Sequence, residues 1–383
     1  MKPKTQTLKS NVALTGLTAL TLFALTACSG FQSSDSNSQP ENTAGTPVAQ
    51  TPVCPSNTEE LEASMTALLT DANSDYDFTY QIERADGRQY VFNWKGSTPQ
   101  TERESASTSK MVTGMVIMRL VEKGVLRLSD YPQDYISDWP IASTDSLYGM
   151  TLEHLLSFRS GLTDEPLCVN SPSTTLANCV RTIATTNAAN GKVPGAEFYY
   201  SGTHMQVAGL MAMRALGKTT WAEVFAQFQS ETGLFPNGRY DLPSATNPRL
   251  AGGMHWTGAE YLDFLRALKN GKLLSKENMA LWLIDRTPEP AVQIVKSPAI
   301  DGIGEDWHYA LGSWHECLSP VFNCTEPVRI SSPGAYGAYP FWDRAFNYIG
   351  MLSIQTDLGG FRYGTADLER RVTAKANEWA SCQ

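Results

Sequence analysis

Residues 107–110, Ser-Thr-Ser-Lys, open a largely apolar run over residues 111–121 that stops at Gly124. In a helix, side chains three residues apart share a face, so the Lys110 amine can lie within hydrogen-bond reach of the Ser107 hydroxyl. The positive potential of a helix N-terminus favours an alkoxide at Ser107 and the neutral form of Lys110. The stretch therefore predicts a nucleophile beside its base. The alternative is an N-cap serine followed by a solvated lysine, because one such spacing is expected by chance in a chain of this length.

The N-terminus has the pattern of a secretion signal. Its basic residues are Lys2, Lys4 and Lys9, and the apolar stretch 12–27 then ends in small residues before Cys28. That stretch is shorter than the roughly 20 residues that span a bilayer, which favours a cleaved signal over residues 1–27 rather than a transmembrane anchor. The pattern resembles a bacterial lipoprotein signal. The resemblance implies acyl chains on Cys28 and, because Ser29 follows, sorting to the outer membrane with the protein facing the periplasm.

A polar segment follows, over residues 28–53. It is rich in Ser, Asn, Gln, Pro, Thr and Gly, and Phe31 is its one aromatic residue, so it cannot bury enough apolar surface to fold. We expect a disordered tether. Without the three lysines of the signal, 27 basic and 39 acidic residues remain, a formal charge of −12. No basic block offsets that charge, which argues against nucleic acid or anionic lipid as a partner.

Seven cysteines support an exported protein. Apart from Cys28 they are Cys54, Cys168, Cys179, Cys317, Cys324 and Cys382. Six cysteines allow fifteen pairings, but two pairs close short loops, Cys168–Cys179 and Cys317–Cys324, which leaves Cys54 with Cys382. Zinc is the competing interpretation. There is no C-x-x-C, and the five histidines lack H-x-x-x-H spacing, so we expect neither a metal nor another cofactor.

The order of predicted elements defines the fold class. A capping signal at Asn57 begins a helix, and two alternating runs, 78–83 and 89–94, flank Asp86-Gly87, a strong hairpin signal. Strands are predicted again at 309–314, 328–330 and 348–354, before a closing helix at 365–380. Strands at both ends predict an α+β fold, with one antiparallel sheet built from both chain ends and flanked by helices. We expect one domain at 54–383, with its α/β part at about 54–128 and 290–383 and a mainly helical insertion at about 129–289.

Four segments in order resemble the penicillin-recognising serine hydrolases, the branch of class C β-lactamases, D,D-peptidases and β-lactamase-like carboxylesterases. They are Ala-Ser-Thr-Ser-Lys at 106–110, MTLEHLLSFRSGL at 150–162, PGAEFYYSG at 194–202 and Ala-Gly-Gly-Met at 251–254. The resemblance covers about residues 57–383, and chance matches in this order are improbable. It implies a β-lactamase-like fold and a serine hydrolase, with Ser107 as the nucleophile.

The resemblance also implies roles for individual residues. Tyr200 would move protons between the serine, the leaving group and water; its phenol needs a positive neighbour to be a phenolate, and Lys110 is the candidate. Ser107, Lys110 and Tyr200 thus form the predicted catalytic set. The oxyanion would be bound by the backbone N–H groups of Ser107 and Ala335, the latter on an edge strand. The alternative for Tyr200, beside Tyr199, is a core aromatic residue.

Two departures from the family pattern bear on the substrate. The second motif has Gly202 where the family has an asparagine that holds the substrate's acyl-amide group. The third motif, Lys-Thr-Gly in the family, is closest to Ser332-Pro333-Gly334, so the usual cation for a substrate carboxylate is absent. Ser332 and Gly334 are the predicted substrate-binding residues, but a serine offers only a neutral hydrogen bond, weaker than a charge-assisted one. Pro333 suits an edge strand because it has no N–H.

Three functions remain open. The first, which we expect, is a lipid-anchored serine hydrolase that cleaves an ester or amide lacking a free carboxylate next to the scissile bond. The second is a D,D-peptidase or β-lactamase with penicillin-binding activity. The third is a catalytically weak binding or sensor protein of the same fold. The expected partners are a small-molecule or peptide substrate and the membrane, through the lipid on Cys28.

Overall fold

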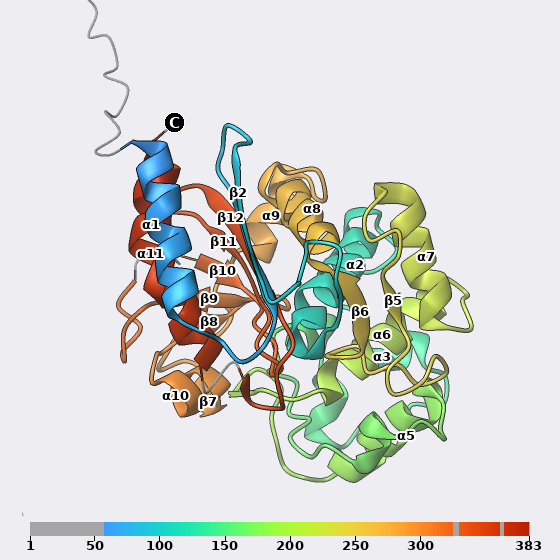
Figure 1. Ribbon diagram of the computed structural model, residues 1–383. Coiled ribbons are helices and arrows are strands. Elements are labelled where there is room, and N and C mark those ends of the chain that lie inside the picture. The colour runs from blue at the N-terminus through green and yellow to red at the C-terminus, as the bar shows by residue number, and fades with distance from the viewer. Residues whose placement is uncertain (1–56, 325–328, 361–363, 383) are drawn as a thin grey trace, which may run out of the picture. The chain divides into compact units, whose positions relative to one another are not determined.

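A seven-stranded antiparallel sheet lies at the centre of the folded unit (Figure 1). The computed structural model describes residues 57–324, 329–360 and 364–382. The strand order is β2-β1-β12-β11-β10-β9-β8. The strands are β1 (Phe78–Glu83), β2 (Gln89–Trp94), β8 (His308–Tyr309), β9 (Trp314–Glu316), β10 (Arg329–Ser331), β11 (Tyr339–Asp343) and β12 (Tyr348–Ile354). The predicted α+β class, with a sheet built from both chain ends, is confirmed.

The N-terminal hairpin joins the C-terminal strands through β1. This strand pairs with β12 from Phe78 opposite Ile354 to Glu83 opposite Ile349. It is buried along its whole length because helices cover both faces of the sheet. β1, β2 and β12 have the bounds that the sequence pattern predicts.

Helices form a layer on each side of the sheet (Figure 1). α1 (Thr58–Asp71) and α11 (Ala366–Ser381) lie side by side on one face, where Trp379 Nε1 of α11 donates to Glu62 of α1 at 2.8 Å. α8 (Gly258–Lys269) covers the opposite face, with α2 (Ser109–Glu122) beside it. α8 falls within the predicted insertion, 129–289, yet it packs on the large sheet.

The remaining helices lie mostly beyond α2, away from the sheet (Figure 1). They are α3 (Pro132–Tyr135), α4 (Leu152–Leu156), α5 (Leu176–Asn187), α6 (Thr203–Ala215), α7 (Trp221–Thr232), α9 (Lys276–Trp282) and α10 (Pro298–Ile303). Two small sheets accompany them: β3 (Glu102–Glu104) with β6 (Met254–Thr257) and β5 (Arg239–Tyr240), and β4 (Glu197–Tyr199) with β7 (Gln293–Lys296). α2 is buried nearly all round, as its apolar sequence predicts.

Two strand predictions need correction, and one strand of the large sheet was not predicted. Residues 309–314 form no single strand, because a turn in which the Ala310 N–H donates to the Ser313 carbonyl at 2.9 Å separates β8 from β9. β10 is not an edge strand, since it pairs with both β9 and β11. Pro333 follows β10 in the loop, where no ladder bond needs its N–H. The sequence pattern gives no signal for β11, because Pro340 interrupts it; there the Pro340 carbonyl accepts from the Ser332 N–H at 3.3 Å.

Two of the three predicted disulfides are present, Cys168–Cys179 and Cys317–Cys324. The third rests on Cys54, which lies outside the described residues. The predicted signal at 1–27, the lipid site Cys28 and the tether at 28–53 lie outside them as well. Within the described part of the chain, no helix is both long enough and apolar enough to cross a membrane.

Candidate active site

Ser107 lies on a tight 3₁₀ turn, Ala106–Thr108, directly before α2. Ala106 has a φ of 42°, a conformation that residues other than glycine rarely adopt. The turn packs closely against Gly334, where a Cβ would lie 2.7 Å from the Ser105 carbonyl oxygen. The half-buried serine is therefore held at a fixed point at the N-terminus of a buried helix.

Lys110 is buried on the first turn of α2. Its Nζ lies 2.8 Å from Ser107 Oγ and 2.9 Å from the Ala251 carbonyl oxygen. Burial removes the ammonium from water and lowers the pKa of Lys110 to about 7, and the nearby carboxylate of Glu165 only partly offsets this shift. A large fraction of the amine is therefore neutral at pH 7 and able to accept the Ser107 proton.

Tyr200 completes the predicted catalytic set. Burial raises the pKa of Tyr200 to about 12, and hydrogen bonds with Ser107 and Trp314 lower it only in part. Lys110 Nζ lies 4.5 Å from the centroid of the Tyr200 ring. The phenol is therefore protonated at neutral pH, which differs from the expected phenolate. The physical reason is that a half-neutral lysine supplies too little positive charge to overcome the burial of the phenol.

Aromatic packing fixes the orientation of the Tyr200 ring. Trp314 stacks on it with 5.1 Å between ring centroids, and Phe158 meets it edge-on at 5.4 Å. His204 stacks on Phe158, and its Nε2 lies 2.8 Å from the Tyr199 carbonyl oxygen. Burial lowers the pKa of His204 to about 4, so this ring is neutral and supports the tyrosine segment without competing for protons.

The two predicted oxyanion donors lie on the same cavity. Ser107 and Ala335 both line it. The Ala335 carbonyl accepts from the Gly359 N–H at 2.8 Å, which fixes the loop after Gly334. Among the residues that the structure describes, the N–H groups of Ser107 and Ala335 have no acceptor. They remain available to a carbonyl oxygen that becomes negatively charged.

Ser332 does not line the cavity, in contrast to the predicted substrate-binding role. It is 2% exposed, and its hydroxyl donates to the Ser107 carbonyl oxygen at 3.0 Å. Pro333, Gly334 and Ala335 line the cavity in its place. The Ser332 side chain thus holds the peptide of the nucleophile, whereas substrate binding at Gly334 stays a prediction.

A cavity of about 660 Å³ opens over these groups. Its apolar lining comprises Pro298, Ala299, Trp307, Trp314 and Leu358. Its charged lining, besides Lys110, comprises Glu165, Lys296 and Asp301. Within the described ranges, no group of three or more histidine, cysteine or acidic residues is placed to hold a metal ion.

The sequence pattern gives no signal for Glu165, Lys296 or Trp314 as site residues. None belongs to a motif, and each lies far along the chain from Ser107. Strand pairing explains the position of Lys296: β7 runs parallel to β4, and the Lys296 carbonyl accepts from the Tyr200 N–H at 3.1 Å. Only the folded chain brings these side chains to the nucleophile.

The fold and the serine–lysine–tyrosine site define a class of protein. The Beta-lactamase family model matches residues 83–374, most of the described chain. The chain belongs to the beta-lactamase family, whose fold is that of a group of serine hydrolases.

Individual relatives are distant. Protein flp of Staphylococcus aureus (strain NCTC 8325 / PS 47) is 27% identical over 134 residues, which cover 34% of this chain and 26% of flp, about a quarter of its length. A provisionally assigned beta-lactamase of Bacteroides dorei DSM 17855 aligns with a TM-score of 0.68 at 22% identity, over 83% of this chain and 98% of that one. EstCE1, a hydrolase with promiscuous acyltransferase activity, aligns with a TM-score of 0.63 at 18% identity, over 82% and 98%. At these identities the two structures support the fold alone.

Proposed function

We propose that this protein is a lipid-anchored serine hydrolase that cleaves an ester or amide through an acyl-enzyme on Ser107. One observation carries the catalytic part: an amine with a pKa of about 7, that of Lys110, lies 2.8 Å from the Ser107 hydroxyl in a cavity that a substrate can enter. A solvated lysine, with a pKa of about 10.4, would stay protonated at neutral pH and could not act as a base.

In acylation, Ser107 transfers its proton to the neutral amine of Lys110 while its oxygen bonds to the substrate carbonyl carbon. The N–H groups of Ser107 and Ala335 bind the negative charge that develops on the carbonyl oxygen. The leaving group departs with the proton of the Tyr200 hydroxyl, and Tyr200 regains a proton from the Lys110 ammonium.

Deacylation runs the same proton path with water in place of the leaving group. Water gives a proton to the Tyr200 oxygen as the water oxygen attacks the ester carbon, and the Tyr200 hydroxyl proton moves to the Lys110 amine. The Ser107 oxygen then leaves with a proton returned from the ammonium, which restores the starting state.

The lining of the cavity favours a substrate without a carboxylate beside the scissile bond. The third-motif position supplies no charged side chain, because Ser332 is neutral and faces the Ser107 carbonyl. The walls at Pro298, Trp307 and Trp314 suit an apolar group on the acyl or the leaving side.

A D,D-peptidase or β-lactamase is the second candidate, and Lys296 is the observation that favours it. Its side chain lines the cavity and lies over the Tyr199 ring, with 4.9 Å from Nζ to the centroid. Lys296 has no ion-pair partner among the described residues. A cation there would bind a substrate carboxylate in place of the lysine that the third motif lacks.

Covalent labelling tests these functions. A fluorophosphonate and a fluorescent penicillin are each incubated with the wild type and with Ser107→Ala, whose melting temperature should stay within a few degrees. Labelling by the phosphonate alone supports the ester or amide hydrolase, and labelling by both supports the second candidate. No labelling of folded wild type favours a binding or sensor protein. If Ser107→Ala is labelled as well as the wild type, the nucleophile is wrongly assigned.

The lipid anchor on Cys28 and the location at the outer membrane are proposed from the N-terminal sequence. The full chain, expressed in a Gram-negative bacterium fed labelled palmitate, should take up the label and sediment with the outer membrane. Cys28→Ala should do neither. Label on the Cys28→Ala variant would contradict the anchor.

A further inference from the structure

Glu165 is held at the catalytic cavity by a backbone donor. Its Oε2 accepts from the Gly202 N–H at 2.8 Å, and both residues line the cavity together with Ser107 and Lys110. Among the charged groups, Glu165 has the largest effect on the pKa of Lys110, which it raises. The carboxylate is therefore within electrostatic reach of the catalytic pair, although it forms no ion pair with Lys110.

The carboxylate also fills the space beside Gly202. A Cβ placed on Gly202 would lie 3.4 Å from Oε1 and 3.6 Å from Oε2 of Glu165. A Cβ at position 202 would thus be in van der Waals contact with this carboxylate. At this wall of the cavity, two residues after Tyr200, the chain presents a carboxylate from a different segment.

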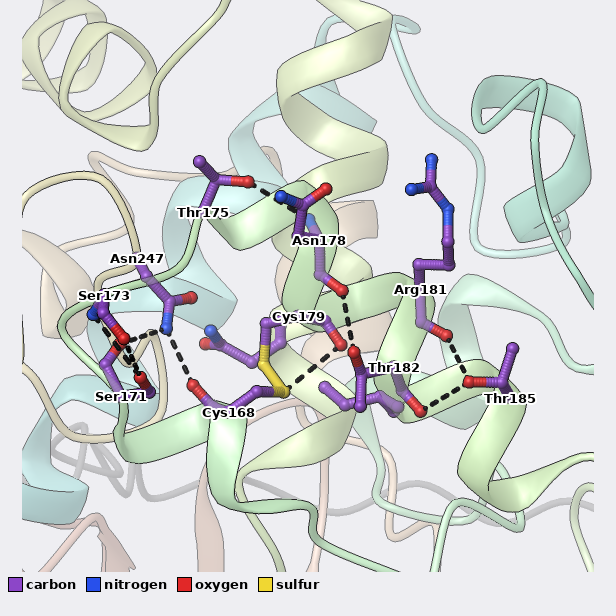
Figure 2. The surroundings of a disulfide bond; sticks show 12 residues. Cys168, Ser171, Ser173, Thr175, Asn178, Cys179, Arg181, Thr182, Thr185 and Asn247 are labelled. Carbon is purple, nitrogen blue, oxygen red and sulfur yellow. Dashed lines mark hydrogen bonds between the residues drawn. A yellow bond between two sulfur atoms is a disulfide. The ribbon is translucent and has the colours of Figure 1, made fainter.

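The segment that carries Glu165 is fastened a few residues further on. Cys168 is bonded to Cys179 of α5, and the Cys168 carbonyl accepts from the Asn247 side chain at 2.8 Å (Figure 2). The same amide donates to the Ser171 carbonyl at 2.9 Å. These bonds limit the movement of the loop, so the position of the carboxylate is set before a ligand arrives.

The Glu165 carboxylate makes this wall of the cavity a hydrogen-bond acceptor. An ionised carboxylate accepts hydrogen bonds and donates none, and its two oxygens have more acceptor sites than the Gly202 N–H uses. A carbonyl or carboxylate of a ligand would be repelled there, whereas a protonated amine would form a charge-assisted hydrogen bond. An α-amino group is one carbon away from its carbonyl, so both fit in the same cavity.

We propose that Glu165 selects substrates that carry a protonated amino group next to the scissile carbonyl, that is, α-amino esters or amides. Such selection rests on the acyl transfer proposed above and names its substrate class. The apolar walls at Trp307 and Trp314 suit an aromatic or aliphatic side chain on the same carbon.

A structural role is the competing explanation, because the same carboxylate binds the N-cap residue of α6, Gly202. Glu165→Gln separates the two roles: the amide oxygen still accepts from the Gly202 N–H, but the negative charge is gone. Asp301→Asn is the matched control. It removes another carboxylate from the cavity lining, one carried by α10.

The test uses three methyl esters: those of L-phenylalanine and D-phenylalanine, which carry the α-amino group, and that of 3-phenylpropanoic acid, which lacks it. The assay is run at about pH 6.5, where α-amino groups with pKa values of about 7.7–8.0 are largely protonated. For the wild type, kcat/KM for one enantiomer of the phenylalanine ester should exceed kcat/KM for the 3-phenylpropanoic ester by about 10- to 100-fold. This ratio corresponds to the usual contribution of a hydrogen bond to a charged group. Glu165→Gln should bring this ratio close to one, and Asp301→Asn should leave it within about threefold of the wild type.

Three results would overturn the selection. They are a wild type without preference for the amino ester, a preference that survives in Glu165→Gln, and an equal loss in Asp301→Asn, which would assign the effect to the net charge of the cavity. Unchanged melting temperatures would exclude misfolding of the variants.

Failure of the acyl transfer itself would be distinguishable, because the wild type would then hydrolyse none of the esters. Calorimetry on Ser107→Ala measures amine recognition without turnover, with phenylalaninamide and 3-phenylpropanamide as the probes. Binding of phenylalaninamide about tenfold tighter or more, lost when Glu165→Gln is added, supports the selection. Equal binding of the two amides overturns it.

Discussion

Two buried cations of this protein have opposite surroundings. Arg329 of β10 pairs with Glu369 at 2.9 Å and with Asp343 at 3.3 Å. Burial alone would lower the pKa of Arg329, but Glu369, together with Tyr348, Tyr339 and Glu316, raises it well above the usual value. Lys110 of α2 is also buried, yet its polar contacts are the Ser107 hydroxyl and a backbone carbonyl, and its pKa is lowered to about 7.

The difference lies in whether a carboxylate stands within ion-pair distance. Arg329 stays charged and joins β10 to β11 and α11. Lys110 is left close to the balance between its charged and neutral forms, which makes it a base but leaves a cation poorly solvated in the folded state. Removing the two side chains should therefore change activity and stability in opposite ways.

The largest effect is expected for Lys110→Met. Loss of the base should lower kcat/KM by about 10³- to 10⁴-fold. The free energy of unfolding at pH 7 should rise by about 1–3 kcal/mol, because a buried ammonium is removed at the expense of its two hydrogen bonds. The folded pKa of Lys110 lies below the ordinary lysine value of 10.5, so the unfolded chain binds more protons between pH 7 and 10.5. Wild-type stability thus rises with pH in that window, and the gain of the variant should shrink there. Denaturant titrations at several pH values measure this gain, and a loss of stability at pH 7 would contradict it.

Arg329→Met should act in the reverse sense. It leaves Glu369 and Asp343 buried without their cation, which should lower the free energy of unfolding by about 3–5 kcal/mol. The kcat/KM of the folded fraction should stay within about twofold. Arg88→Met is the control, because Arg88 pairs with Glu62 at the surface. Its loss should lower the free energy of unfolding by about 0–1 kcal/mol. Equal losses for the two variants would show that the buried cluster contributes nothing special.

Tyr200→Phe sharpens the assignment of the proton path. The ring and its packing on Trp314 are kept, so the melting temperature should change little, while kcat should fall by about 10²- to 10³-fold. Single-turnover kinetics would show slower acylation and deacylation together. Full activity in this variant would leave Lys110 to move every proton alone.

The pH dependence of kcat/KM follows from the neutral form of Lys110. Activity should rise about tenfold per pH unit below a pKa of about 7 and level off above it. A substrate without ionisable groups, assayed from pH 5 to 9, gives this profile directly. An inflection near 10 would mean that Lys110 is solvated in solution and that burial does not set its ionisation.

The smallest effect is expected for Ser332→Ala. It removes the hydrogen bond to the Ser107 carbonyl, which should lower kcat by a fewfold and stability by about 1 kcal/mol. KM should hardly change, because Ser332 does not line the cavity. A large rise in KM with kcat unchanged would restore the substrate contact that the sequence predicts for this residue.

The success of the sequence predictions depends on how local their causes are. The hairpin at 78–94 and the strand at 348–354 have the predicted bounds, because alternation and turn residues act over a few positions. Residues 309–314 were predicted as one strand although Gly312-Ser313 is a local turn signal, and Gly312 adopts a φ of 94° in the turn between β8 and β9. The sequence pattern gives no signal for β11, where Pro340 interrupts an otherwise regular strand.

The candidate site divides in the same way. The pairing of Ser107 with Lys110 follows from their separation of three residues in a helix, so the sequence alone predicts it. Trp314, Lys296 and Glu165 reach the cavity through strand pairing and loop closure, which no local pattern encodes. The sequence also could not predict the ionisation of the site. The pKa of Tyr200 is about 12 because the phenol is buried, and burial is set by the tertiary structure.

The sequence by itself determined the family, the bounds of the hairpin at 78–94 and of the strand at 348–354, and the serine and lysine that share one helix face. These features arise from contacts between residues near each other in the chain or from ordered motifs. The tertiary structure decided which buried cations have a carboxylate within ion-pair distance and which do not. Whether a buried cation becomes a structural ion pair, as at Arg329, or a base, as at Lys110, depends on carboxylates that distant segments bring within reach or keep away.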